Sequence, residues 1–194
     1  IVIVFLILPM LISSKEFGIQ SYVDWYVSLS EKNLSNQSLT SRQDYSLMGV
    51  VRRILGRADL SNLLFVIPGF VLFMLPYLRV KQYKNLNFQL MILASSLLFL
   101  VLFSSGSESP TYIIAVSGVM IWFMMQKKLS KIDIGLLIFV MIFTCFAFSD
   151  LFPKFIKEDY FIKYATKAIP CIIIWFRVMY ELLTKDFEKD YQLD

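Results

Sequence analysis

Long apolar runs with few charged residues dominate the sequence and limit the folds that it can adopt. A helix needs about 20 apolar residues to cross the ~30 Å hydrocarbon core of a bilayer. Runs near that length occupy residues 63–78, 86–103, 111–126, 132–149 and 167–183. They are continuously apolar, whereas strands of a membrane barrel alternate apolar and polar residues. With 57% hydrophobic residues, the pattern predicts an all-α, polytopic transmembrane helical bundle.

The domain prediction is one transmembrane domain over residues 1–184, followed by a charged cytoplasmic tail at 185–194. The run at 1–13 is too short to span a bilayer and starts without Met or a basic segment. It is therefore expected to be the end of a truncated first helix, which leaves about five full spans. Residues 14–62 are expected to form a long outer loop.

Two short amphipathic helices are predicted within this outer loop. Ser21 and Asp24 have the spacing of a capping box, and apolar residues at helical spacing follow to about residue 30. A polar loop is expected at 31–40. The second helix is expected to place Leu47, Val51, Ile54 and Leu55 on one apolar face and to end at Gly56.

The distribution of basic residues predicts an orientation. The short loops at 79–84 and 127–131 each hold three Lys or Arg residues and no acidic residue. The positive-inside rule places such loops in the cytoplasm. The polar segments 14–62, 104–110 and 150–166 then share the extracytoplasmic face, and the expected location is a bacterial inner membrane, crossed several times.

Polar residues on that shared face are the candidate site. Guanidinium groups match phosphate oxygens, and amides and hydroxyls suit sugar hydroxyls. The candidate substrate-binding residues are Asn36, Gln37, Ser38, Arg52, Arg53, Ser107, Glu108 and Tyr112. No catalytic residue is assigned, and no metal site or cofactor is expected, since the chain has no His and both Cys residues lie in apolar runs.

Each candidate also has a structural interpretation. Glu108 precedes Ser109 and Pro110, which are suited to N-cap and first-turn positions, so its charge could simply favour the positive end of a helix dipole. The amides near Asn36 could form a solvated turn. The arginines could contact lipid headgroups instead of a substrate.

Three segments resemble one enzyme family. These are Asn36-Gln37-Ser38-Leu39 with the arginine-bearing helix after it, the serine-rich stretch 102–112, and the tail segment that runs from 149–153 through 168–171. They are similar to the C-terminal half of glycosyltransferase family 87, in the form of Bacteroidetes-type members. Many members carry a histidine before the hairpin tyrosine, where this chain has Thr111 before Tyr112.

The resemblance implies a transferase that moves a mannose- or arabinose-like sugar from a polyprenyl-phosphate donor to a glycan or glycolipid acceptor. It implies that the transfer takes place on the extracytoplasmic face and that an acidic residue upstream of these segments acts as the base. It also implies membrane lipids as further partners and no nucleic acid as a partner. A transporter or flippase for lipid-linked saccharides, and a polysaccharide polymerase or ligase component, are the alternatives. The centres of the runs between residues 63 and 149 carry no charge, which disfavours ion-coupled transport.

Overall fold

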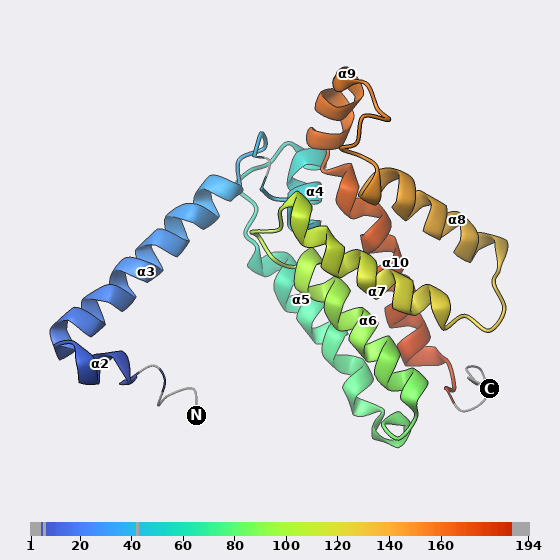
Figure 1. The fold of residues 1–194 in the computed structure, drawn as a ribbon, viewed down its shortest axis with the longest axis horizontal. Coiled ribbons are helices and arrows are strands. Elements are labelled where there is room, and N and C mark those ends of the chain that lie inside the picture. Colours follow the sequence, from blue (N-terminus) through green and yellow to red (C-terminus); the bar gives the residue numbers. More distant parts are fainter. Residues whose placement is uncertain (1–4, 6, 42, 188–194) are drawn as a thin grey trace. The chain divides into compact units, whose positions relative to one another are not determined.

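The computed structural model describes residues 5, 7–41 and 43–187, and every regular element among them is helical (Figure 1). The predicted all-α class is therefore confirmed for this part of the chain. The chain divides into two compact units, residues 1–36 and residues 37–194. The predicted domain range 1–184 covers parts of both.

The first unit is a short helix followed by a long one. Helix α2 covers Pro9–Ile12 and α3 covers Lys15–Asn36. Ser14 Oγ accepts from the Phe17 backbone N–H at 3.2 Å and so caps the start of α3. The predicted helix start at Ser21 and the loop at 31–40 are corrected here, because α3 runs without a break to Asn36 and Ser21 Oγ donates to the Phe17 carbonyl inside it. Residues 1–4 and 6 of the predicted truncated helix lie outside the described residues.

The second unit is built around three helices: α6 (Leu86–Leu102), α7 (Tyr112–Met124) and α10 (Ile169–Thr184). Helices α6 and α7 approach closely at Gly118, where an added Cβ would lie 2.8 Å from the Ala94 carbonyl oxygen. Large buried side chains from these helices, including Leu98, Trp122 and Trp175, fill the core. Figure 1 shows the three helices side by side.

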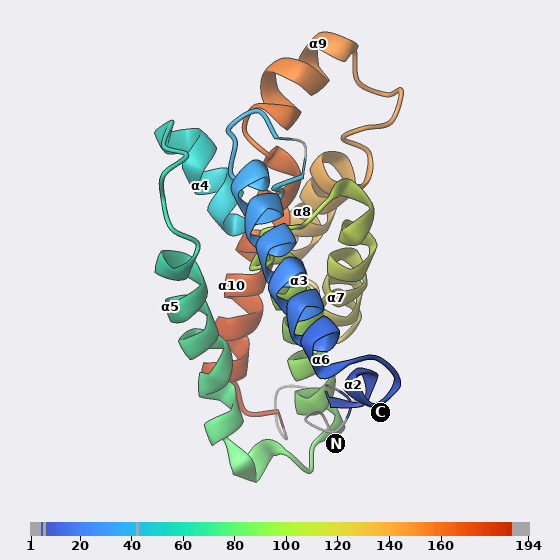
Figure 2. The same cartoon turned by 90° about the vertical axis from the view of Figure 1, so that its left-hand side faces the viewer.

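Shorter elements surround this core. They are α4 (Leu47–Leu55), α5 (Leu63–Met74), η1 (Leu75–Leu78), η2 (Val80–Gln82), η3 (Ser109–Thr111), α8 (Lys131–Val140), η4 (Met141–Cys145), α9 (Lys154–Ile156), η5 (Lys157–Ile162) and η6 (Thr166–Ala168). Figures 1 and 2 both show α4 and α9 at the end of the unit opposite the turn between α5 and α6.

The start of the predicted cytoplasmic tail packs on the second unit. The Phe187 side chain is buried and lies edge-on to Phe88, with ring centroids 5.3 Å apart. Asn85 Nδ2 donates to the Phe187 carbonyl at 3.0 Å. Residues 188–194 of the predicted tail lie outside the described residues.

No helix among the described residues combines the length and the apolar composition that crossing a membrane requires. The longest helix, α3, has 22 residues but a polar composition, and α6 has 17 residues. The apolar runs do become helices, but several change their winding part-way: α5 passes into a 3-10 helix at Leu75, and α8 into a π-helix at Met141. The predicted polytopic transmembrane bundle is therefore wrong, and so is the predicted multi-pass location in a bacterial inner membrane.

Candidate functional site

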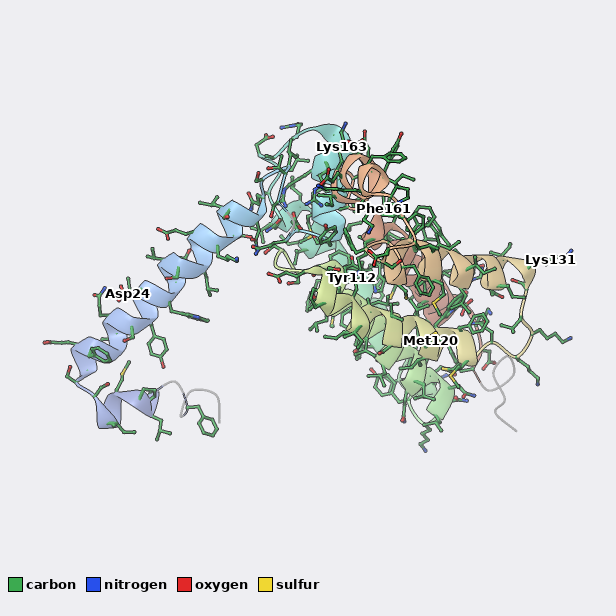
Figure 3. All side chains as sticks on the ribbon, turned by 45° about the horizontal axis from the view of Figure 1, so that its top comes forward. Asp24, Tyr112, Met120, Lys131, Phe161 and Lys163 are labelled. Carbon is green, nitrogen blue, oxygen red and sulfur yellow. The ribbon has the colours of Figure 1, made fainter. Side chains whose placement is uncertain are left out.

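Two of the predicted site segments meet at the α4 end of the second unit. The backbone N–H of Tyr45, just before α4, donates to the Ser107 carbonyl at 3.0 Å. The hydroxyl of Tyr112, the first residue of α7 (Figure 3), donates to the Tyr45 carbonyl. Burial raises the pKa of Tyr112 well above its ordinary value, so its phenol stays a neutral donor. These two bonds join the α4 segment to the tip of the α6–α7 hairpin.

Within the hairpin tip, Ser107 and Glu108 have different environments. The Ser107 hydroxyl is buried and donates to the Val101 carbonyl, which closes the end of α6. Glu108 is exposed, and its backbone N–H donates to Thr111 Oγ1 at 2.9 Å. Glu108 therefore takes the N-cap position of η3, one residue earlier than the Ser109 cap that the sequence predicts. Of the two, only the Glu108 side chain faces solvent.

Arg52 is held inside the protein by a network of oxygens. Its Nη1 donates to Asp44 Oδ2 at 2.9 Å, and both side chains are almost completely buried. Its Nε and Nη2 donate to the Leu60 carbonyl at 3.0 and 2.8 Å, and Nη2 also donates to Asn62 Oδ1. Four of the five N–H donors of a guanidinium are thus used. The network ties both ends of α4 to the segments that flank it.

Arg53 is bound by backbone carbonyls. It donates to those of Leu39, Ser41 and Asp44, the last at 2.6 Å. Its guanidinium carbon lies 5.5 Å from the centroid of the Tyr45 ring. Burial lowers the pKa of Arg53. The proposed phosphate contacts of Arg52 and Arg53 stay a prediction.

Helix α4 exposes two of the four residues of its predicted apolar face. Its bounds and its Gly56 stop agree with the sequence, and Gly56 adopts a left-handed conformation with φ of 66°. Ile54 and Leu55, however, are 60% and 58% exposed, while Arg52 is 1% exposed. The oxygens of Asp44, Leu60 and neighbouring residues explain this, because a buried guanidinium is tolerated only where such partners satisfy it.

The three amide and hydroxyl candidates lie at the boundary between the units. Asn36 is the last residue of α3 and is buried. Gln37 is half-buried and Ser38 is exposed, and Ser38 Oγ lies 3.1 Å from Thr40 Oγ1. Gln37 and Ser38 belong to the second unit, and their role in sugar binding stays a prediction.

Lys167, in η6, is a cation that the sequence interpretation did not select. Its Nζ donates to Ser109 Oγ at 2.7 Å and to the Ser109 carbonyl at 3.1 Å. The same Nζ lies 5.4 Å from the centroid of the Tyr112 ring and 5.5 Å from that of Phe148. Lys167 is 7% exposed, and burial lowers its pKa. In the sequence, Lys167 stands next to an apolar run, which is typical of a lysine at a helix end near an interface. The sequence therefore gave no indication of its contact with Ser109.

Asp44 is the second residue that sequence reasoning missed. The Ser46 hydroxyl donates to Asp44 Oδ1 and accepts from the Gly49 backbone N–H at 3.0 Å, so Ser46 caps α4. Gly49 is needed because an added Cβ would lie 2.2 Å from the Asp44 carbonyl oxygen. An Asp two residues before a capping Ser, with arginines on the helix that follows, is the pattern that predicts such a network.

An apolar cavity of about 170 Å³ opens beside this end of the unit. It is lined by Leu47, Phe65, Pro68, Gly69, Leu72, Phe103, Trp175 and Phe176, here named the apolar slot. Leu47 directly follows the capping Ser46, and Phe103 directly precedes the hairpin tip. Gly69 permits the close approach of α5, since an added Cβ would lie 2.1 Å from Phe103 Cε1. The slot thus adjoins the polar segments along the chain.

Comparisons with known proteins give no match: no family model, no curated protein and no solved structure is significantly similar to this chain. The geometry of the site is therefore the basis for a functional proposal, together with the resemblance of the sequence motifs.

Proposed function

We propose that this chain binds a polyprenyl-phosphate-linked sugar and serves in the transfer of that sugar to a hydroxyl acceptor. One observation carries the proposal: two residues that line the apolar slot adjoin polar segments along the chain. Leu47 and Phe103 line the slot, and their chain neighbours Ser46 and Ser104 begin the polar segments. A lipid-linked sugar phosphate has the same order of parts, an apolar chain that leads to a polar head.

The size of the slot suits part of an isoprenoid chain. A cavity of roughly 150 Å³ holds a benzene-sized molecule, and the slot measures about 170 Å³. It therefore accommodates a short segment of the chain and not a whole lipid. Its walls include the rings of Phe65, Phe103, Trp175 and Phe176. Such rings supply large apolar contact areas against a branched, unsaturated chain.

Polar groups for the sugar are available near the hairpin tip. Glu108 is exposed, and a carboxylate accepts hydrogen bonds from sugar hydroxyls. Gln37 and Ser38 offer an amide and a hydroxyl from the segment before α4. All three are among the substrate-binding candidates that the sequence predicts. The sugar and the acceptor follow from the resemblance to glycosyltransferase family 87 alone.

Binding of a short donor analogue tests the proposal. The full chain is titrated with farnesyl phosphoryl-mannose and with mannose 1-phosphate, and binding is followed by calorimetry. We expect saturable binding of the farnesyl compound and at least tenfold weaker binding of the sugar phosphate without the chain. Equal affinity for both compounds, or no saturable binding of the farnesyl compound, would contradict the proposal.

The Gly69→Ala variant tests the slot directly. The added methyl group collides with the Phe103 ring and so changes the shape of the slot. Gly135→Ala is the matched control, because a Cβ there meets no heavy atom within 4 Å. Gly69→Ala should weaken binding of the farnesyl compound, and Gly135→Ala should leave it unchanged. If both variants changed binding equally, the slot would not be the binding site of the farnesyl chain.

A further inference from the structure

We propose that Lys167 and Ser109 together form the subsite that receives the phosphate group of the lipid-linked substrate. This inference deepens the proposed function and rests on it. It assigns to the site a cation from η6 that is not among the substrate-binding residues predicted from the sequence. The hairpin tip at residues 104–110 contains no basic residue of its own.

Lys167 differs from the buried Arg52 in its partners. Arg52 is paired with the Asp44 carboxylate at 2.9 Å. In the part of the chain that the structure describes, no carboxylate forms an ion pair with Lys167; its contacts are the hydroxyl and carbonyl of Ser109 and two aromatic rings. A buried ammonium without a counter-ion is costly. A bound anion would supply that counter-ion.

The donor geometry suits a phosphate oxygen. An ammonium carries three N–H donors, and the described contacts of Lys167 use two of them, both on Ser109. The third remains for a ligand. The Ser109 hydroxyl supplies a second donor 2.7 Å from the ammonium, and Ser109 is half-buried, so it reaches solvent where Lys167 does not. Two donors at this spacing can contact a single phosphate group.

The subsite is also held in place before any ligand arrives. Thr144 Oγ1 donates to the Lys167 carbonyl at 2.9 Å, which fixes the backbone of η6. Tyr112 and Phe148 flank the ammonium, and Tyr112 is itself fixed by its bond to Tyr45. A donor group that is ordered in advance loses little conformational entropy on binding. Arg52, in contrast, is already paired with the Asp44 carboxylate.

The test compares three probes on the full chain: farnesyl phosphate, farnesol and inorganic phosphate. Lys167→Met removes the charge and keeps the length of the side chain. Lys163→Met is the matched control, since Lys163 is an exposed lysine four positions away that lies over the Tyr164 ring (Figure 3). Loss of a hydrogen bond to a charged group predicts roughly 10- to 100-fold weaker binding of farnesyl phosphate to Lys167→Met. Farnesol binding should change less than about twofold.

Ser109→Asp is a second variant that keeps the inference testable if Lys167→Met fails to fold. It places a carboxylate beside the ammonium and should block farnesyl phosphate while retaining the wild-type unfolding temperature. Equal binding of farnesyl phosphate by wild type, Lys167→Met and Ser109→Asp would overturn the subsite but leave the proposed function standing. Failure of the wild type to bind either farnesyl compound would overturn both. Equal affinity for inorganic phosphate and farnesyl phosphate would show that the subsite binds free phosphate, and would overturn the assignment of a lipid phosphate as its ligand.

Discussion

The ammonium of Lys167 lies 2.7 Å from the hydroxyl of Ser109, although the two residues are 58 positions apart. This contact joins η6, which directly precedes α10, to the tip of the α6–α7 hairpin. A second contact, from Tyr112 to the Tyr45 carbonyl, joins the same hairpin to the segment before α4. The polar end of the second unit is thus held by bonds between segments that are distant in the sequence, and each bond makes a testable prediction.

Replacing Asp44 by Ala should destabilise the protein strongly. The change leaves the buried Arg52 guanidinium without its carboxylate, and removal of one partner of a buried ion pair costs about 3–5 kcal/mol. Urea unfolding followed by circular dichroism measures the loss. Asp59→Ala is the control, because the Arg57–Asp59 pair is exposed, and it should leave the unfolding midpoint unchanged. Equal midpoints for both variants would show that the Asp44 network does not hold α4.

Replacing Tyr112 by Phe should loosen the hairpin from the α4 segment. The variant keeps the ring but leaves the buried Tyr45 carbonyl without this donor, at a cost of about 1–3 kcal/mol. The matched control is Tyr160→Phe, because Tyr160 is 58% exposed. Thermal unfolding of the two variants gives the comparison, and hydrogen exchange at the Tyr45 amide gives a local readout. Unchanged protection of that amide in Tyr112→Phe would contradict the predicted link.

Binding of an anion at Lys167 should depend on pH. Burial lowers the pKa of Lys167 below its ordinary value of 10.5, so the ammonium loses its proton at lower pH than an exposed lysine does. Binding needs the charged form and should fall as the pH rises through the lowered pKa. Tyr112, Cys145 and Cys171 interact with this region, but their own pKa values are raised, that of Cys171 to about 12.

Farnesyl phosphate binding between about pH 7.5 and pH 10.5 measures this effect, since the phosphate itself titrates near pH 6. Lys167→Arg is the control because its guanidinium stays charged over the whole range. Stability should change in the opposite sense: between the lowered pKa and 10.5 the unfolded state binds more protons, so the free energy of unfolding rises with pH. Wild-type binding that is as flat as that of Lys167→Arg would be incompatible with Lys167 as the cation.

Gly69→Ala should lower stability, while Gly135→Ala should raise it slightly. At Gly69 the added Cβ would lie 2.1 Å from a Phe103 ring carbon, so α5 or the ring must move. Overpacking of this kind typically costs about 1–3 kcal/mol. Gly135 lies in α8 with open space around its Cβ position, and Ala gains up to about 1 kcal/mol over Gly in a helix interior. Chemical unfolding of both variants decides the sign for each.

Local sequence patterns predict most of the helix positions. The apolar runs at 86–103 and 167–183 become α6 and α10, and Gly56 ends α4 because it can adopt the left-handed conformation. The lengths of the α-helices do not follow from hydropathy alone. A change from α-helix to another helix type at Leu75 and at Met141 shortens two of them. The transmembrane prediction is wrong because it takes each apolar run as one continuous α-helix.

The site was less predictable because its contacts are long-range. Periodicity placed Leu47, Val51, Ile54 and Leu55 on one apolar face of α4, but Ile54 and Leu55 are exposed, and carbonyls of the flanking segments satisfy the buried Arg52 and Arg53. The contact of Lys167 with Ser109 likewise depends on how two helices pack. The sequence placed the hairpin tip and the α4 segment together only through a shared membrane face, whereas the structure joins them by direct hydrogen bonds.

Photocrosslinking tests the central claim most directly, because it maps where a lipid phosphate lies. Farnesyl phosphate with a diazirine at the end of its chain is bound to the full protein, irradiated and located by mass spectrometry of the peptides. We expect crosslinks to Phe103, Trp175 and their neighbours in the slot. Excess unlabelled farnesyl phosphate should reduce these crosslinks, and so should the Lys167→Met substitution. Crosslinks that fall outside the slot, or that excess unlabelled compound does not reduce, would contradict the claim that the slot and Lys167 bind a lipid phosphate.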